Sequence, residues 1–588
     1  MKTTFGAVGS LLRIAAGVRL RREHFGGMAF ATGTGTTVDV DRPVFAALDR
    51  LRQRGVQGAE ALVRQLGGGR NDAQQLTEAQ RLLSQLVDLA ILAPASQADM
   101  KQAAKPESPE SETAEHSDVC WPSGPHLAAP VTVHWAVTHQ CTLRCPECYV
   151  QRHAQGFSEE LTLPEALRLV TILADWGVFE LAIGGGEPLE FPLLPAIVKE
   201  ARRQGLVVHV TTGWHHVPAA RLAELAEGLT GLQIGVKADR LLASPSTETA
   251  VLARTAAAAA QAGLHVGANL ILSKQTLPHF GKLLELLQQA GLTNVTLLRY
   301  KPPADVAEWR RAKPPVQALR EFESQLPEVL RGHPQITLRL DCALSFFQRH
   351  LAPVQALAQG LRGCVAGDRL LALTPDGSAF PCSQLVHPRF CVGNLLRDPL
   401  EQLWTQSPIL RRYRRFRTNG AFQATACGLC AAKDHCGGCR ALAADGWGAE
   451  PECPGPRVPP VNQLGKTGRR WDLARHLRLH GSISVRDYMQ QYGVGQKRAI
   501  AELRAFGCPL NSGTGRKQSD IYLDPTEDVV GDIQDSIGYT QASFPLASRE
   551  EIAGSIGAAR DEADGHYPEW LRREREDDFG DLESARGF

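Results

Sequence analysis

The stretch "CTLRCPEC" at residues 141–148 places three cysteines, Cys141, Cys145 and Cys148, within eight positions. No other cysteine lies within twenty residues on either side. A structural zinc site needs four ligands, commonly from two Cys-x2-Cys pairs, whereas this stretch has one such pair and a third cysteine. The stretch alone therefore leaves a zinc knuckle, a redox pair and a three-thiolate cluster site open.

The composition of the 588-residue chain is typical of a soluble protein with several domains, with 43% hydrophobic and 22% charged residues. The net charge of +1 gives no global reason to expect nucleic acid or an anionic membrane as a partner. No apolar run approaches the ~20 residues that span a bilayer, and Arg13 interrupts the apolar patch near the start. We therefore expect a cytoplasmic protein without a membrane partner, in which clustered thiols bind metal rather than form disulfides.

Six apolar, strand-like runs alternate with helical patterns between residues 128 and 305. The first run precedes the three cysteines, and the second continues into "GGGEP" at 184–188. This alternation predicts an α/β fold with a parallel sheet, either open or a partial barrel. Functional residues of such folds lie at the carboxyl ends of the strands, so we expect the cysteine loop and the glycine segment to meet at one edge.

Gly185, Gly186 and Glu187 follow the second predicted strand, and with the cysteine loop after the first strand they resemble the radical S-adenosylmethionine (SAM) superfamily. The resemblance implies a partial (β/α)6 barrel and a 4Fe–4S cluster held by the three cysteines, whose open iron binds SAM. In that family Gly-Gly-Glu meets the amino group of SAM, and reduction releases a 5′-deoxyadenosyl radical. Close backbone approach at glycine and a carboxylate suited to an ammonium agree with this role.

Eight of the fourteen cysteines lie between residues 364 and 453, in a pattern that resembles the auxiliary-cluster (SPASM) extension of peptide-modifying radical enzymes. The resemblance implies two auxiliary 4Fe–4S clusters. Their expected ligands are Cys427, Cys430, Cys436 and Cys453 for one, and Cys364, Cys382 and Cys439 for the other.

The second of these clusters lacks a fourth ligand, because no cysteine lies between Cys364 and Cys382. Either Cys391 completes it or one iron is open to substrate. The two-residue spacing between Cys436 and Cys439 is one shorter than the common pattern, and a zinc ribbon built from the two Cys-x2-Cys pairs between 427 and 439 stays an alternative. The remaining thiols are expected to be plain buried ones: Cys120, Cys342 and Cys508.

Several polar residues at predicted strand ends are further site candidates. Lys237 follows the fourth strand and is either directed at substrate or a surface lysine. Asn269, which we place after the fifth strand, is a candidate contact of the cofactor. Tyr300 and Lys301 end the sixth strand and are candidates to face the pocket, with Lys237 and Tyr300 as the candidate catalytic residues.

Residues 1–95 contain three strand-like runs, "VRLRRE", "GGMAFAT" and "TTVDVD", followed by three helical stretches. They resemble the winged-helix, PqqD-like domain that recognises precursor peptides; a generic small α/β cap is the alternative. In the family a leader peptide adds as a strand beside the third strand, here Thr36–Asp41, and lies against the third helix, here roughly Thr77–Leu92. Residues 96–127 are polar and rich in Pro, Ser and Glu, which predicts a flexible linker.

Together these resemblances imply an enzyme that modifies a ribosomally synthesised precursor peptide by hydrogen abstraction, giving a crosslink, an epimer, an oxidation or a backbone excision. They also imply a flavodoxin- or ferredoxin-type reductant. Two alternatives stay open: a sulfatase-maturase-like enzyme that acts on a protein, and a non-enzymatic iron–sulfur protein with an electron-transfer or structural role.

The region beyond residue 460 contains a helix–turn–helix pattern at 484–507 and a wing-like segment, which predicts a winged-helix-like domain over 461–525. Residues 466–518 hold eleven Lys or Arg and three Asp or Glu, whereas 519–588 hold six and eighteen. Because the acidic tail would compete for the basic surface, we expect protein or peptide docking rather than nucleic-acid binding. The expected domains are 1–95 peptide recognition, 96–127 linker, 128–345 barrel, 346–456 SPASM, 461–525 winged-helix-like and 526–588 acidic tail.

Overall fold

The computed structural model describes residues 11–455 with short gaps, and parts of residues 473–522. The gaps before residue 455 are 34, 67–72, 97–98, 100–120, 123, 125, 151–158, 304, 352–355, 357–360, 424 and 444–445. Most of the expected linker, the whole of the expected acidic tail, Cys120 and Cys508 lie outside the described residues. The chain divides into two units, one of Met1–Ala304, Ala312–Ser345 and Pro353–Arg415, the other of Asp305–Arg311, Phe346–Ala352 and Phe416–Phe588.

A ten-stranded sheet dominates the first unit, in the order β13-β12-β11-β10-β9-β8-β7-β14-β15-β16. The six predicted runs form parallel strands of this sheet, which confirms the α/β fold class. They are β7 (Thr132–Thr138), β8 (Glu180–Gly185), β9 (Val207–Thr212), β10 (Gly231–Gly235), β11 (His265–Leu272) and β12 (Asn294–Arg299). The sheet is longer than predicted, because four more strands extend it: β13 (Thr337–Leu340), β14 (Leu370–Leu373), β15 (Ser378–Phe380) and β16 (Gly393–Asn394).

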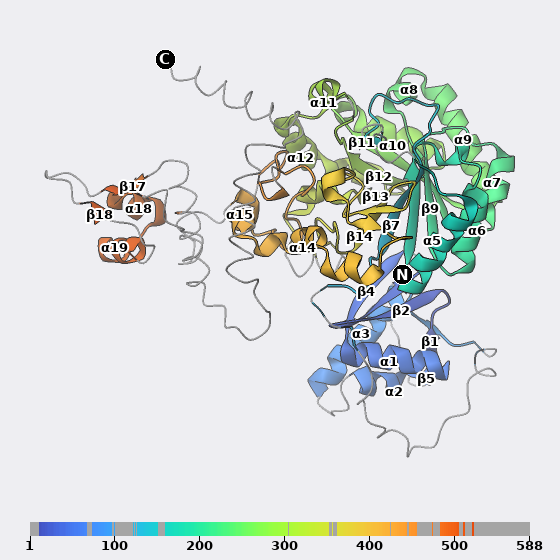
Figure 1. Ribbon diagram of the computed structural model, residues 1–588, viewed down its shortest axis with the longest axis horizontal. Coiled ribbons are helices and arrows are strands. Elements are labelled where there is room, and N and C mark those ends of the chain that lie inside the picture. Colours follow the sequence, from blue (N-terminus) through green and yellow to red (C-terminus); the bar gives the residue numbers. More distant parts are fainter. Residues whose placement is uncertain are drawn as a thin grey trace. The chain divides into compact units, whose positions relative to one another are not determined.

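Helices connect successive parallel strands, as right-handed crossovers require. The crossover helices are α5 (Leu163–Trp176), α6 (Leu194–Arg203), α7 (Ala219–Ala226), α8 (Ala238–Ala243), α9 (Pro245–Gln261), α10 (Phe280–Gln289) and α12 (Val316–Gly332). Local sequence sets their ends: α5 begins at a capping box of Thr162 and Glu165 and ends at the left-handed Gly177. Figure 1 shows α5 to α9 along the outer side of the sheet.

The amino-terminal part of the first unit contains the predicted strands β2 (Val18–Glu23), β3 (Gly26–Ala31) and β4 (Thr36–Asp41), which form one antiparallel sheet. The three predicted helices are also present: α1 (Arg42–Arg54), α2 (Ala59–Leu66) and α3 (Ala73–Asp88). A second small sheet was not predicted. It joins β1 (Leu11–Ile14), β5 (Gln57–Gly58) and β6 (Leu92–Pro94), so the strand expected to be third is the fourth of the chain.

Strand β3 is buried on both sides. Ala29 and Ala31 pack in the core under α1, whereas Met28 and Phe30 pack against barrel residues. The rings of Phe30 and Phe179 stack with centroids 4.9 Å apart. Because Phe179 directly precedes β8, the small sheet covers the amino ends of the barrel strands.

The second unit contains α15 (Gly420–Gln423) and α16 (Ala426–Leu429) beside the later cysteines. Near the carboxyl end, α18 (Val485–Tyr492) and α19 (Gln496–Arg504) form the predicted helix–turn–helix, with left-handed Gly493 in the turn. Strands β17 (Ser482–Ser484), β18 (Leu510–Asn511) and β19 (Asp520–Tyr522) pair beside them. Within the described part of the chain, no helix combines the length and the apolar character needed to cross a bilayer.

Candidate active site

The loop after β7 wraps backbone around the first cysteine. The N–H groups of Leu143 and Arg144 donate to the Cys141 sulfur, and Arg144 has a positive φ of 46°. Burial raises the pKa of the Cys141 thiol, and these two hydrogen bonds oppose that shift. Backbone N–H groups that point at a sulfur stabilise it as a thiolate, the form that binds iron. The loop therefore suits a cluster ligand better than an inert thiol.

Two glycines of the "GGGEP" segment, Gly185 and Gly186, are required by the backbone that leads into the cysteine loop. Gly186 N donates to Thr138 O at 2.7 Å, and Glu187 N donates to Gln140 O at 2.8 Å. A Cβ on Gly186 would lie 1.9 Å from the oxygen of Gln140. Gly185 has a φ of +114°, which few other residues adopt. The two segments thus meet at the carboxyl edge of the sheet as predicted, by direct backbone contact.

Glu187 is buried and already bound by protein donors. Its Oε1 accepts from Leu189 N at 3.0 Å and Thr212 Oγ1 at 2.7 Å, and its Oε2 accepts from Gly213 N at 2.8 Å. Burial raises the pKa of Glu187, and the three hydrogen bonds oppose that shift. The carboxylate therefore ties the end of β8 to the end of β9, and the contact of Glu187 with SAM stays a prediction.

Lys237 pairs with the cysteine loop, an arrangement that neither expectation for it included. Its Nζ lies 2.6 Å from Oε1 of Glu147, the residue between Cys145 and Cys148, and its side chain is 21% exposed. Burial would lower the pKa of Lys237, but the charge and hydrogen bond of Glu147 and a hydrogen bond to Cys145 raise it. Lys237 therefore ties the end of β10 to the loop that holds the cysteines.

His215 holds the backbone of Lys237 in place. Its Nε2 accepts from Lys237 N at 3.0 Å, so the proton resides on Nδ1, which donates to Glu248 at 2.7 Å. Burial lowers the pKa of His215 despite the charge of Glu248. The sequence analysis missed both His215 and Glu147. Position after a parallel strand would have indicated His215, and no local signal indicated the partner of Glu147.

A second ion pair lies at the carboxyl edge of the sheet, between the ends of β12 and β13. Lys301, after β12, lies 2.6 Å from Asp341, after β13, and its Nζ lies 5.9 Å from the centre of the Tyr149 ring. Burial would lower the pKa of Lys301, but Asp341 and Tyr149 raise it. The hydroxyl of Tyr149 also forms a hydrogen bond with the side chain of Ser383. The other two candidates are Tyr300, which is buried, and Asn269, which lies within β11 and not after it, and whose backbone carbonyl accepts from Val236 N at 2.9 Å.

Cys342 is not the plain buried thiol that was expected, because part of its surface is exposed. Surrounding protein atoms nevertheless desolvate the thiol and raise its pKa well above the ordinary value, with further contributions from Asp341, Cys382 and Cys364. By contrast, the neighbouring charges that raise the pKa of Cys391 are those of Asp376 and Asp398. Two expected ligands of the incomplete auxiliary cluster, Cys364 and Cys382, are therefore among the groups whose charge raises the pKa of Cys342.

The cysteines of the second unit have neighbours of their own. Burial raises the pKa of Cys453 to about 12, and Cys427 and Cys436 act on it as neighbouring thiols. The N–H of Glu450 donates to the Cys427 sulfur at 3.2 Å, and that of Ala432 donates to the Cys430 sulfur at 3.4 Å. Such N–H···S bonds are typical of the surroundings of iron–sulfur clusters.

Single-ion geometry is not seen among these thiols. Within the described residues, no three His, Cys, Asp or Glu side chains converge as ligands of one metal ion. The assignment of Cys439, which belongs to the second unit, to a cluster with Cys364 and Cys382 stays a prediction. Cysteine thiolates are the usual ligands of iron–sulfur clusters, so the thiols of each unit supply that donor set.

Family models match two parts of this arrangement. Residues 135–287, which include the cysteine loop and Gly-Gly-Glu, match the Radical SAM superfamily. Residues 364–437 match SPASM, an iron–sulfur cluster-binding domain. The chain is a radical SAM protein with a SPASM domain. It is thus an enzyme that uses SAM and 4Fe–4S clusters, and neither model covers residues 1–134 or 438–588.

Two curated relatives and one solved structure resemble this radical SAM protein. The PqqA peptide cyclase of Streptomyces rochei is 27% identical over 348 residues, covering 56% of this chain and 90% of the relative. The mycofactocin maturase MftC of Mycobacterium tuberculosis H37Rv is 28% identical, covering 56% and 83%. The crystal structure of Streptococcus suis SuiB has a TM-score of 0.52 at 15% identity, covering 75% of this chain and 99% of SuiB, so the likeness is one of fold.

Proposed function

We propose that this radical SAM enzyme modifies a ribosomally synthesised precursor peptide by abstracting a hydrogen atom from it. The observation that supports this most directly is the cysteine loop bonded to Gly-Gly-Glu at the carboxyl edge of the barrel, in a chain similar to a PqqA peptide cyclase. When bound, SAM and its cluster supply the radical, and the protein determines which carbon is presented. The product, whether a crosslink, an epimer, an oxidation or an excision, follows from that presentation.

The residues of this edge have separable roles in the proposed reaction. The three thiols after β7 would hold the cluster, and the backbone of Gly185 and Gly186 lies against the loop that carries them. Glu187, Lys237 and their partners fix the loop to three neighbouring strands. These ties orient the site without themselves taking part in hydrogen abstraction.

For the incomplete auxiliary cluster we propose Cys342 rather than Cys391 as the additional ligand. The support is that the charges of Cys364 and Cys382 help to raise the pKa of Cys342. The charges that raise the pKa of Cys391 come instead from two carboxylates, those of Asp376 and Asp398. Cys342→Ala is expected to lower the iron content and change the low-temperature electron paramagnetic resonance spectrum of the reduced protein. Cys391→Ala is the matched control and should leave both unchanged. The reverse pattern would favour Cys391 as the ligand, and no change in either variant would favour an iron that is open to substrate.

The small amino-terminal domain is our candidate for peptide capture through strand addition at β4. Within the described residues β4 pairs with β3 alone, and strand addition would use the other edge of β4. The domain lies at the amino ends of β7 to β9, and the cysteine loop follows their carboxyl ends. A strand of seven residues such as β7 spans roughly 23 Å. A precursor captured at β4 therefore needs about seven or more extended residues before the residue to be modified.

We also propose that a flavodoxin- or ferredoxin-type protein supplies the electron, and that the enzyme works in the cytoplasm, where its many free thiols stay reduced. A role of the helix–turn–helix at 485–504 in docking a protein rather than nucleic acid is a further proposal.

The decisive experiment is anaerobic incubation of the cluster-loaded full chain with SAM, dithionite and synthetic peptides encoded beside its gene. We expect 5′-deoxyadenosine and a peptide whose mass or hydrogen–deuterium exchange pattern has changed. Deoxyadenosine without any change in these peptides would argue for another substrate class, such as a folded protein. Absence of deoxyadenosine from the reduced, cluster-loaded protein would contradict the radical reaction itself.

A further inference from the structure

Arg440 is a buried arginine in the cysteine-rich part of the second unit, directly after Cys439. It is only 1% exposed. Its Nη1 donates to the carbonyls of Gly446 at 3.3 Å and Gly448 at 2.8 Å. Among the residues that the structure describes, its Nε and Nη2 atoms have no hydrogen-bond partner. Three of the five N–H groups of this guanidinium therefore lack an acceptor in that part of the chain.

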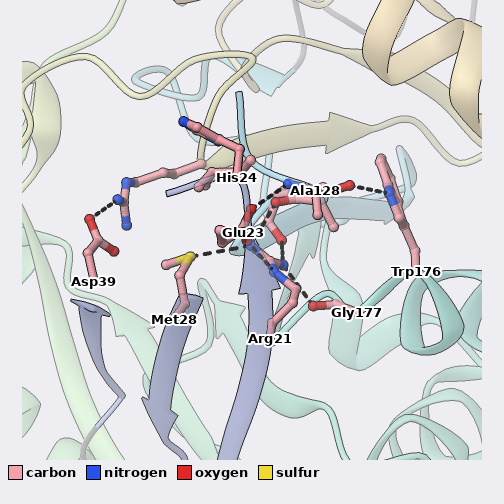
Figure 2. Close-up of polar contacts among 12 residues, drawn as sticks. Arg21, Glu23, His24, Met28, Asp39, Ala128, Trp176 and Gly177 are labelled. Atoms are coloured by element: carbon pink, nitrogen blue, oxygen red, sulfur yellow. Dashed lines mark hydrogen bonds and ion pairs between the residues drawn. The ribbon is translucent and has the colours of Figure 1, made fainter. Parts of the chain in front are cut away.

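The buried arginine of the small domain, Arg21, is bound in the ordinary way (Figure 2). It donates to the carboxylate of Glu23 at 2.7 Å and to the carbonyl of Gly177 at 2.8 Å. Glu23 in turn accepts from Ala128 N at 2.7 Å. The charge of Arg21 is thus balanced by a carboxylate in direct contact, which Arg440 does not have among its hydrogen bonds.

The aromatic rings around Arg440 stabilise a cation but carry no net charge. Its Cζ lies 5.2 Å from the centre of the Phe416 ring and 5.0 Å from the centre of the Phe422 ring. A buried cation without a counter-charge is unfavourable, because the protein interior solvates it poorly. This position therefore requires a negative group nearby.

Local contacts place the guanidinium beside cysteines of the second unit. A Cβ on Gly438 would lie 2.8 Å from Nη2 of Arg440 and 2.7 Å from Cβ of Glu450, so Arg440 and Glu450 are neighbours. The N–H of Glu450 donates to the Cys427 sulfur at 3.2 Å, and its carboxylate accepts from Cys439 N at 2.8 Å. Burial raises the pKa of the Cys427 thiol to about 11, and the charge of Arg440 opposes that rise. The charge of Arg440 therefore reaches the sulfur of Cys427.

We propose that Arg440 is the counter-charge of the auxiliary cluster in the second unit and that it raises the reduction potential of that cluster. The expected ligands of the cluster are Cys427, Cys430, Cys436 and Cys453. Thiolates and the cluster that they bind carry net negative charge, which a buried guanidinium requires. Reduction by one electron adds a further negative charge, so a nearby cation stabilises the reduced form. The inference rests on the proposed ligands and adds the residue that sets the potential.

The test is an anaerobic redox titration of the cluster-loaded full chain, followed by low-temperature electron paramagnetic resonance. Cys427→Ala identifies the signal of this cluster by removing it. Arg440→Gln is expected to lower the midpoint potential of that signal by about 59 mV, a tenfold change in the ratio of reduced to oxidised cluster at a fixed potential. Arg440→Lys keeps the positive charge and should lower the potential far less.

Arg417→Gln is the matched control, because Arg417 stacks on the same Phe416 ring with its Cζ 4.3 Å from the ring centre. It should leave the potential unchanged. The inference is overturned if Arg440→Gln has the wild-type potential, or if Arg440→Gln and Arg440→Lys behave alike. Loss of the cluster from Arg440→Gln alone supports the inference, because Arg440→Lys still supplies the counter-charge. If Cys427→Ala removes no signal, the proposed ligands are wrong and the inference fails with them.

Discussion

The two ends of strands β7 to β9 are built from different kinds of contact. At the amino ends, Phe179 stacks on Phe30 of the small domain, and the Arg21–Glu23 pair is closed by backbone partners. At the carboxyl ends, hydrogen bonds and the close backbone approach at Gly185 and Gly186 hold the loops together. The three cysteines of this end are partly exposed. An end whose groups are satisfied by protein fixes a domain, whereas an end with exposed ligand atoms binds a cofactor.

The largest effect is expected from removing a cluster ligand at the carboxyl ends of β7 to β9. Cys145→Ala removes one of three thiolate ligands and should abolish 5′-deoxyadenosine formation, because the remaining two thiolates cannot hold a site-differentiated cluster. Liquid chromatography of anaerobic reactions measures the product. The thermal unfolding midpoint of the iron-free protein should be unchanged, and deoxyadenosine at the wild-type rate would refute the assignment.

Disrupting the interface at the amino ends of β7 to β9 should loosen the small domain from the barrel and leave the cleavage of SAM unchanged. Glu23→Leu leaves the buried guanidinium of Arg21 without a counter-charge, a change that costs about 3–5 kcal/mol. Hydrogen exchange should accelerate in β2 and β3, and deoxyadenosine formation should persist. Glu285→Leu, which breaks an exposed pair with Lys282, is the control and should change neither.

The same contrast predicts that deletion is a poor way to test the small domain. Removing residues 1–95 would expose Val131, Phe179 and Val207, which the domain covers. The domain is therefore part of the folded body and not a module that only the linker tethers. Point variants in the interface are the sharper probes.

A smaller effect is expected from removing one ion pair at the carboxyl ends of the strands, the pair of Lys237 with Glu147. Lys237→Met removes the ion pair with Glu147 and should destabilise the cysteine loop by about 1–3 kcal/mol. Faster hydrogen exchange of residues 141–150 and faster loss of iron to a chelator would show it. Lys199→Met, at an exposed pair with Glu227, is the control. An unchanged rate of iron loss would mean that the ion pair is incidental.

The smallest expected effect is a pH dependence set by His215. Burial lowers the pKa of His215 in the folded protein, where Glu248, Arg240 and Lys237 face it. Between the ordinary pKa of 6.5 and this lowered value, the unfolded chain binds a proton that the folded chain does not. The free energy of unfolding should therefore fall as the pH falls through that window, by up to about 1.4 kcal/mol per pH unit.

Comparison of the wild type with His215→Gln in denaturant titrations at several pH values isolates this contribution. The wild type should lose more stability than the variant as the pH is lowered from 7.5 to about 5. Equal slopes for the two proteins would show that His215 has no part in the pH dependence.

The sequence by itself determined the parallel sheet, the cysteine loop and the meeting of that loop with Gly-Gly-Glu. These follow from local periodicity and from the rule that carboxyl ends of parallel strands share an edge. The tertiary structure alone decided that Glu187 binds Thr212 and Gly213, that Lys237 pairs with Glu147, and that the charge of Cys364 raises the pKa of Cys342. It also decided that the small domain docks on the barrel through Arg21. The hydrogen bonds and ion pairs among these join residues 25 to 156 positions apart, and the local spacing of residues does not specify which distant partner a buried charge or thiol will meet.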